Sequence, residues 1–226
     1  MFTVLGRLAR AAKRCRFVRY RKLMHSMMKR IAAVILLMWV ASALSQVERV
    51  PAHLHLGHVM TNWRDTPGNA GFLIAALSDA KVAVIHAQLA AKEENSREEI
   101  RLHVTHVLNA LDSSIEPKGP GSGYGVKKAA AGALQHLGLA VAAEGATDNM
   151  KSRAARVVPL LKTVLELIDQ AAGVAENSRQ SNGIVEPRVL AQLLATLCGN
   201  ISDTLEQAKT EMDFMIKDEG LENAPR

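Results

Sequence analysis

Histidine is distributed unevenly along this chain. Of the eight histidines, His25 lies in a basic N-terminal stretch and the other seven fall between residues 53 and 136. Scattered surface histidines would have no reason to stop there, whereas a set contributed by a few neighbouring helices would. The neutral imidazole ring is a common metal ligand in proteins. The distribution therefore predicts a site built from imidazole rings.

Four of these histidines are expected to point into a helical core. His86 and His103 each lie three or four residues from apolar residues of their own helix, which places them on its buried face. His106 is one turn beyond His103, and His136 shares a face with small alanines. We expect His86, His103 and His136 to bind one transition metal, with His106 as a fourth ligand or as the partner of a ligand. Copper is favoured, and zinc and nickel are the alternatives.

A second group of candidate ligands precedes these helices. His53, His55, His58 and Met60 follow one another within eight residues. A thioether selects cuprous ion and imidazole accepts either oxidation state, so this segment is a second candidate copper site. The alternative interpretation is a polar coil in which Met60 belongs to the core.

Other chemistries lack their required residues. A di-iron carboxylate bundle needs Glu-x-x-His pairs, and the nearest approximation, Glu99 with His103, has the wrong spacing. No Cys-x-x-Cys-His motif exists, which excludes covalent c-type haem. Cys198 lies among leucines far from every histidine, which is typical of an inert buried thiol. We therefore expect no catalytic activity.

A glycine-rich segment, residues 116–125, precedes a helix that begins with Val126. It lacks the Gly-Lys-Ser/Thr ending of a phosphate-binding P-loop. The backbone N–H groups at this helix start could attract an anion with help from Lys127 and Lys128. We favour a flexible connection between helices.

Residues 1–45 have the features of an export leader. Lys29 and Arg30 precede an apolar run from Ile31, and small residues follow it, so we expect a signal peptide cleaved after Ala43 or Ser45. A membrane-spanning helix needs about 20 apolar residues, and this run is shorter. We expect a periplasmic or secreted protein without a stable membrane anchor after cleavage. The true start could be Met1 or a methionine at position 24, 27 or 28.

The leader changes the charge balance. Ten of the 28 basic residues and none of the 22 acidic residues fall within residues 1–45, so the net charge of +6 becomes −4 after its removal. Nucleic-acid binding requires a basic patch, and the remaining cations are interspersed with acids. We expect no nucleic-acid partner.

The remaining residues predict an all-α fold, an up-and-down antiparallel bundle of four to five helices. The expected order is a His-rich arm over residues 46–70, a bundle over 71–220 and a tail over 221–226. A short element is expected around residues 53–63. Expected helices, from periodicity and end signals, cover residues 71–92, 97–111, 126–143, 148–178 and 186–217. Ser96 and Glu99 are predicted to form a capping box at the start of the helix over residues 97–111. Thr66 is predicted to cap a helix whose first residue is Pro67. Pro159 predicts a kink or two shorter helices.

An exported helical chain with inward histidines resembles the cytochrome b562-like and cytochrome c′-like bundles. The resemblance is one of architecture. It implies a haem or metal carrier, and Met60 could serve as the methionine ligand of the b562 type. The final helix contains no histidine, so the family's second ligand has no counterpart.

The sequence therefore supports three hypotheses. The first is an exported bundle that binds a transition metal for sequestration, delivery or sensing. The second is a structural or protein-interaction bundle, such as a homodimer, in which the histidines only satisfy local hydrogen bonds. The third is a carrier of non-covalent haem b that uses Met60 and one histidine.

Overall fold

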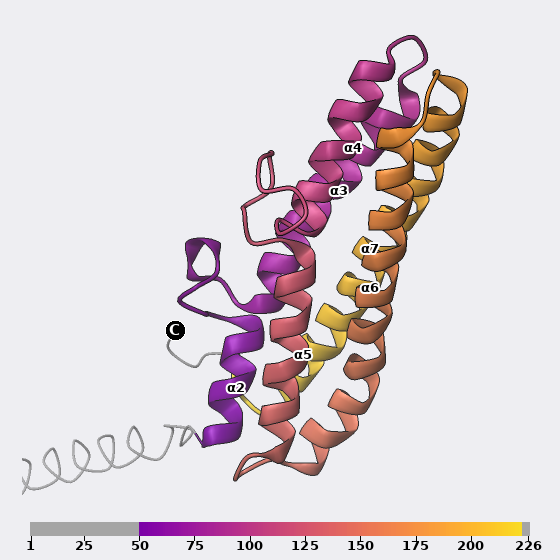
Figure 1. Ribbon diagram of the computed structural model, residues 1–226. Coiled ribbons are helices and arrows are strands. Elements are labelled where there is room, and N and C mark those ends of the chain that lie inside the picture. The colour runs from indigo at the N-terminus through magenta and orange to yellow at the C-terminus, as the bar shows by residue number, and fades with distance from the viewer. Residues whose placement is uncertain (1–49, 223–226) are drawn as a thin grey trace, which may run out of the picture. The chain divides into compact units, whose positions relative to one another are not determined.

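The computed structural model describes residues 50–222, and every regular element in that part of the chain is helical (Figure 1). This confirms the all-α prediction. The expected leader and cleavage site lie outside the described residues. The elements are α2 (Pro51–Met60), the 3-10 helix η1 (Pro67–Asn69), α3 (Phe72–Lys92), α4 (Arg97–Leu111), α5 (Val126–Ala142), α6 (Asp148–Gln180) and α7 (Val185–Asp218).

The start of α4 is capped as expected, with one change of partner. The Ser96 hydroxyl accepts a hydrogen bond from the Glu99 backbone N–H at 3.1 Å. The Ser96 backbone N–H donates to Glu93 Oε1, and so does that of Asn95. Glu93 thus provides the reciprocal carboxylate that the capping box assigned to Glu99.

Thr66 does not cap a helix, contrary to the prediction. Its hydroxyl donates to the backbone carbonyls of Trp63 and Ala70. Pro67 follows and begins only the three-residue η1. Thr66 therefore closes the loop between α2 and α3, because both of its acceptors are loop carbonyls.

Helix α6 continues through Pro159 as one helix of 33 residues. The prediction of two shorter helices was wrong. Pro159 and Ala155 are both exposed, so the Ala155 carbonyl that lacks an N–H partner can accept from water. The proline therefore costs less here than it would on the buried face.

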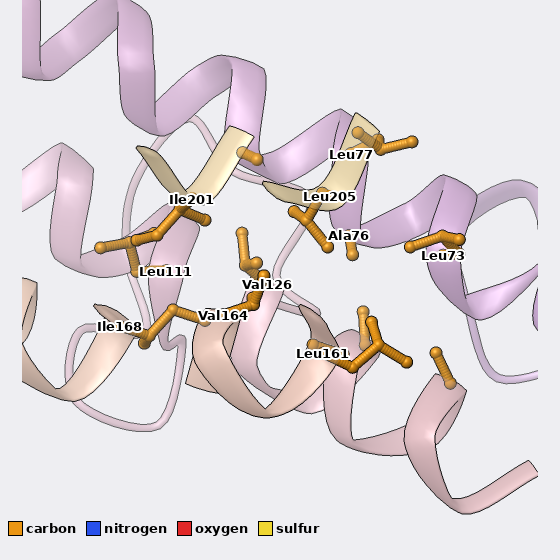
Figure 2. Packing of buried hydrophobic residues seen from close by; sticks show 14 of the residues in the cluster. Leu73, Ala76, Leu77, Leu111, Val126, Leu161, Val164, Ile168, Ile201 and Leu205 are labelled. Carbon is orange, nitrogen blue, oxygen red and sulfur yellow. The ribbon is translucent and has the colours of Figure 1, made fainter. Parts of the chain in front are cut away.

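The helices pack around one apolar core. The long helices α6 and α7 lie side by side, α3 packs against α4 and α7, and α2 packs against α5. Figure 2 shows the centre of this core, where Leu111 of α4 and Val126 of α5 meet side chains from α3, α6 and α7. Alanines fill many of the remaining buried positions, which lets the backbones approach closely.

Helix α3 is the one helix within residues 50–222 that is long and apolar enough to cross a membrane. Half of its most apolar window is buried inside the protein. Core helices of soluble proteins have the same length and composition, so this feature alone does not indicate a membrane-spanning helix.

Candidate metal centres

Three histidines from α3 and α4 form the first cluster, which we call the α3–α4 site: His86, His103 and His106. The Nδ1 atom of His86 lies 3.0 Å from Nδ1 of His103 and 3.3 Å from Nδ1 of His106. All three side chains are partly buried. The site therefore has a pair of histidines at i, i+3 on one helix and a single histidine on the neighbouring helix.

The α3–α4 hairpin explains this meeting. His86 lies six residues before the end of α3, and His103 lies six residues after the start of α4. At 1.5 Å per residue, both are about 9 Å from the turn. A four-residue connection makes the two helices antiparallel neighbours, so the two rings are placed opposite each other.

Three histidines from α2 and α5 form the second cluster, the α2–α5 site: His55, His58 and His136. The Nδ1 atom of His136 lies 3.1 Å from Nδ1 of both His55 and His58. His136 is only 8% exposed, whereas the other two are partly buried. This site repeats the same arrangement, with the i, i+3 pair now on α2.

Two aromatic rings enclose the α2–α5 site. The ring centroids of Trp63 and Phe72 lie 4.8 Å and 5.2 Å from that of His136. Trp63 also lies 4.8 Å from His58, edge to face. Gly132, one turn before His136, leaves room for Phe72, because a Cβ at this glycine would overlap the Phe72 ring. These rings were not among the predicted site residues, since isolated aromatics in the sequence carry no such signal.

The structure groups the predicted ligands differently from our expectation. His136 lies with His55 and His58, and His106 completes the α3–α4 site in its place. Phe72 contacts His136 at the start of α3, and His86 lies 14 residues further along that helix, a rise of about 21 Å. His136 therefore lies too far away to share a metal ion with His86.

The other two predicted ligands of the N-terminal segment belong to neither cluster. Met60 packs against the core. His53 lies 3.5 Å from the Glu219 carboxylate through Nε2, but neither ring nitrogen has hydrogen-bond geometry to a partner. A helical α2 explains this, because His55 and His58 share one face while His53 points to another side.

The surroundings favour the neutral imidazoles that metals require. Burial lowers the pKa of His136, and the neighbouring His58 and His55 rings lower it further. Burial likewise lowers the pKa of His86, with added contributions from His106 and His103. The pKa values of His58 and His106 are lowered in the same way. A proton competes with a metal for the same lone pair, so a lowered pKa favours metal binding near neutral pH.

The nitrogen spacing matches a shared metal ion. Tetrahedral ligand nitrogens with bonds of 2.0–2.1 Å lie about 3.3 Å apart. The four close Nδ1 pairs lie 3.0–3.3 Å apart, two in each site. In each group the three ligand atoms all lie within 4.8 Å of one another, so one ion could contact all three after a local adjustment of the rings.

The glycine-rich segment is held by internal partners. The buried Asp79 carboxylate accepts hydrogen bonds from the backbone N–H groups of Ser122 and Gly125 and from the Ser122 hydroxyl. Asn109 accepts from the Gly121 N–H and donates to the Glu116 carbonyl. Asp79 thus binds two backbone N–H groups of this segment, including that of Gly125 directly before α5. Sequence reasoning missed Asp79 because a lone acid on an apolar helix has no motif.

Cys198 is buried, and burial raises the pKa of its thiol to about 12. It therefore remains a protonated thiol, as expected for an inert core residue.

Comparisons of the chain with known protein families, with curated proteins and with solved structures gave no match.

Proposed function

We propose that this protein binds two transition-metal ions, one in the α2–α5 site and one in the α3–α4 site. It would act in metal sequestration, delivery or sensing, in the periplasm or outside the cell. The sequence hypothesis had one core site and a second candidate site in the N-terminal segment, and the proposal regroups their histidines into two sites of the same design.

The contacts of the two central rings support the proposal most strongly. An imidazole nitrogen carries either one N–H or one lone pair, so it makes one good hydrogen bond in the plane of its ring. The His136 Nδ1 atom nevertheless faces two other nitrogens at 3.1 Å, and His86 Nδ1 faces two at 3.0 and 3.3 Å. Two hydrogen bonds can share that one N–H or lone pair only in a three-centre arrangement, in which each bond is weakened. A metal ion satisfies all three nitrogens at once.

Ligand type narrows the choice of metal. Both clusters consist of imidazoles alone, without a thiolate or a carboxylate. Imidazole suits copper, zinc and nickel, and the affinity of such sites for divalent ions is greatest for copper. We therefore favour copper, with zinc and nickel as the alternatives.

The test is the metal stoichiometry of the purified protein. After equilibration with cupric, zinc or nickel ion and removal of the excess, the unaltered chain should retain two equivalents of the preferred metal. His86→Ala and His136→Ala should each retain one, because each removes the central ring of one site. His53→Ala is the matched control and should retain two, because this histidine belongs to neither cluster.

The same measurement separates the competing functions. A structural bundle without cofactor would retain no metal. A carrier of haem b would instead bind haem stoichiometrically and show a Soret band. Two axial nitrogens on a haem iron lie about 4 Å apart on opposite sides of the macrocycle. The Nδ1 atoms in each cluster are closer than this, so two histidines of one cluster would not serve as the axial pair, and the haem alternative is that of Met60 with one histidine.

A further inference from the structure

A cavity of about 930 Å³ lies beside the α2–α5 site. Its wall comes from α2, from the loop that follows it, from Ile74 of α3 and from the C-terminal end of α7. His58 belongs both to this wall and to the cluster of possible metal ligands. The cavity is thus the space next to one ligand of the proposed metal ion, and its volume is in the range of small-molecule pockets.

The metal would keep a free coordination position. Within residues 50–222, no fourth histidine, cysteine or carboxylate joins His55, His58 and His136 in a group of ligands. Metal sites with three protein ligands complete their coordination with water or with an exogenous ligand, and such sites are found where a protein binds or exchanges a ligand. Trp63 and Phe72 contact His136, and Trp63 also contacts His58 edge to face. His58 is the ligand that also lines the cavity.

The cavity wall limits the chemistry of that ligand. Leu54, Ile74 and Ile216 offer apolar surface, and Thr61 and Asn62 offer neutral hydrogen-bonding groups. Apart from histidine, the ionisable residues of the wall are two acids, Asp213 and Glu222. Asp213 forms an ion pair with Lys209. The wall residues therefore offer a charged ligand no cation of their own, whereas the apolar ones suit an uncharged body.

We propose that the α2–α5 metal accepts a neutral small organic ligand through this cavity, with a nitrogen donor on the metal and an apolar body against the wall. This inference rests on the proposed metal binding at the same site.

Gly57 offers a way to close the cavity without touching the ligands. It lines the cavity, and a Cβ added there would meet no heavy atom within 4 Å. Gly57→Leu should therefore project its side chain into the cavity, and replacing a helical glycine also favours the helix. Gly173→Leu is the matched control, because Gly173 is an exposed helical glycine of α6 with equally open surroundings.

The experiment uses the full chain with His86→Ala, so that only the α2–α5 site holds copper. If that variant folds poorly, His103→Ala serves the same purpose. The probe is 4-phenylimidazole, titrated against the Cu(II) form and followed by electron paramagnetic resonance and visible absorption. We expect saturable binding with copper retained, binding weakened at least tenfold by Gly57→Leu, and a change of less than twofold with Gly173→Leu.

The inference would be overturned by retained copper with no response to the probe, or by equal binding by the Gly57→Leu and Gly173→Leu variants. Copper that the probe removes from the protein also counts against it. Failure to retain any copper before the probe is added would instead contradict the proposed metal function, so the two failures are distinguishable.

Discussion

Each cluster consists of three imidazole rings, but the surroundings of the two clusters differ. His136 is 8% exposed and contacts both Trp63 and Phe72. His86, His103 and His106 are partly buried, and within residues 50–222 only histidine rings are in ring contact with them. A metal in the α2–α5 site would thus have an indole next to it. A metal in the α3–α4 site would not.

This difference predicts a site-specific optical signal. Cupric ion in the α2–α5 site should quench the fluorescence of Trp63, because the indole contacts two of its ligands, His58 and His136. Ion in the α3–α4 site lies about 21 Å away along α3 and should quench far less. The measurement is tryptophan emission during a copper titration in a Trp39→Phe background, which leaves Trp63 as the only indole.

Quenching should survive in His86→Ala and disappear in His136→Ala. Equal quenching in both variants would show that the copper near Trp63 does not depend on the α2–α5 cluster.

The lowered histidine pKa values also predict how the metal-free protein responds to pH. His58, His86, His106 and His136 all have pKa values below the usual 6.5, chiefly through burial. Each of these histidines has a lower pKa in the folded chain than in the unfolded chain. Between those two values the unfolded chain binds more protons, so the free energy of unfolding rises with pH in that window. We expect the urea midpoint in the presence of a chelator to fall as the pH drops from about 7.5 to 5.5.

The control for this pH dependence removes two of the histidines with lowered pKa values. A His86→Ala, His106→Ala double variant should show a shallower dependence over the same pH range. Acids with lowered pKa values, such as Glu211, lose their contribution only at lower pH and do not account for this window. A midpoint that increases on acidification contradicts the prediction.

At the scale of elements, the α3–α4 hairpin made the α3–α4 site predictable from the sequence, whereas the α2–α5 site was not predictable. A four-residue connection fixes the register of α3 against α4, so the inward histidines at equal distances from the turn must meet. Helix α5 follows a loop of 14 residues held by Asp79 and Asn109, and no sequence signal fixes its register. The expectation therefore named His136 as an inward histidine but gave it the wrong neighbours.

The contact between α5 and Phe72 predicts opposite effects for two glycines of one helix. Gly132→Ala places a Cβ against the buried Phe72 ring, and repacking should cost about 1–3 kcal/mol of unfolding free energy. Gly138→Ala meets no atom within 4 Å and should stabilise the protein by about 0.5–1 kcal/mol, because alanine is the better helix former. Chemical denaturation of the two variants is the measurement.

Gly138 also serves as the control for helix propensity. The contact explanation fails if Gly132→Ala is as stable as Gly138→Ala. A loss of metal affinity only in Gly132→Ala would show in addition that Phe72 helps to position His136.

At the scale of the described chain, helix boundaries followed from the sequence better than helix neighbours did. Caps at Ser96 and apolar periodicity are local signals, and they placed most helices within a few residues of the observed ends. Which helices pack together depends on loop lengths and on small side chains such as the glycine at 132, which act between distant segments. The continuous α6 shows the same limit, because the effect of Pro159 depends on which face is exposed.

Two sites without a shared ligand, about 21 Å apart along α3, should stabilise the protein independently. At free metal a hundredfold above its dissociation constant, each site should add about 2.7 kcal/mol to the free energy of unfolding. His86→Ala and His136→Ala should each keep one such increment, and their two increments should sum to that of the unaltered chain. Because α3 carries both His86 and the Phe72 that contacts His136, it is a direct physical link between the sites. A sum that departs by more than about 0.5 kcal/mol would reveal coupling between the two sites.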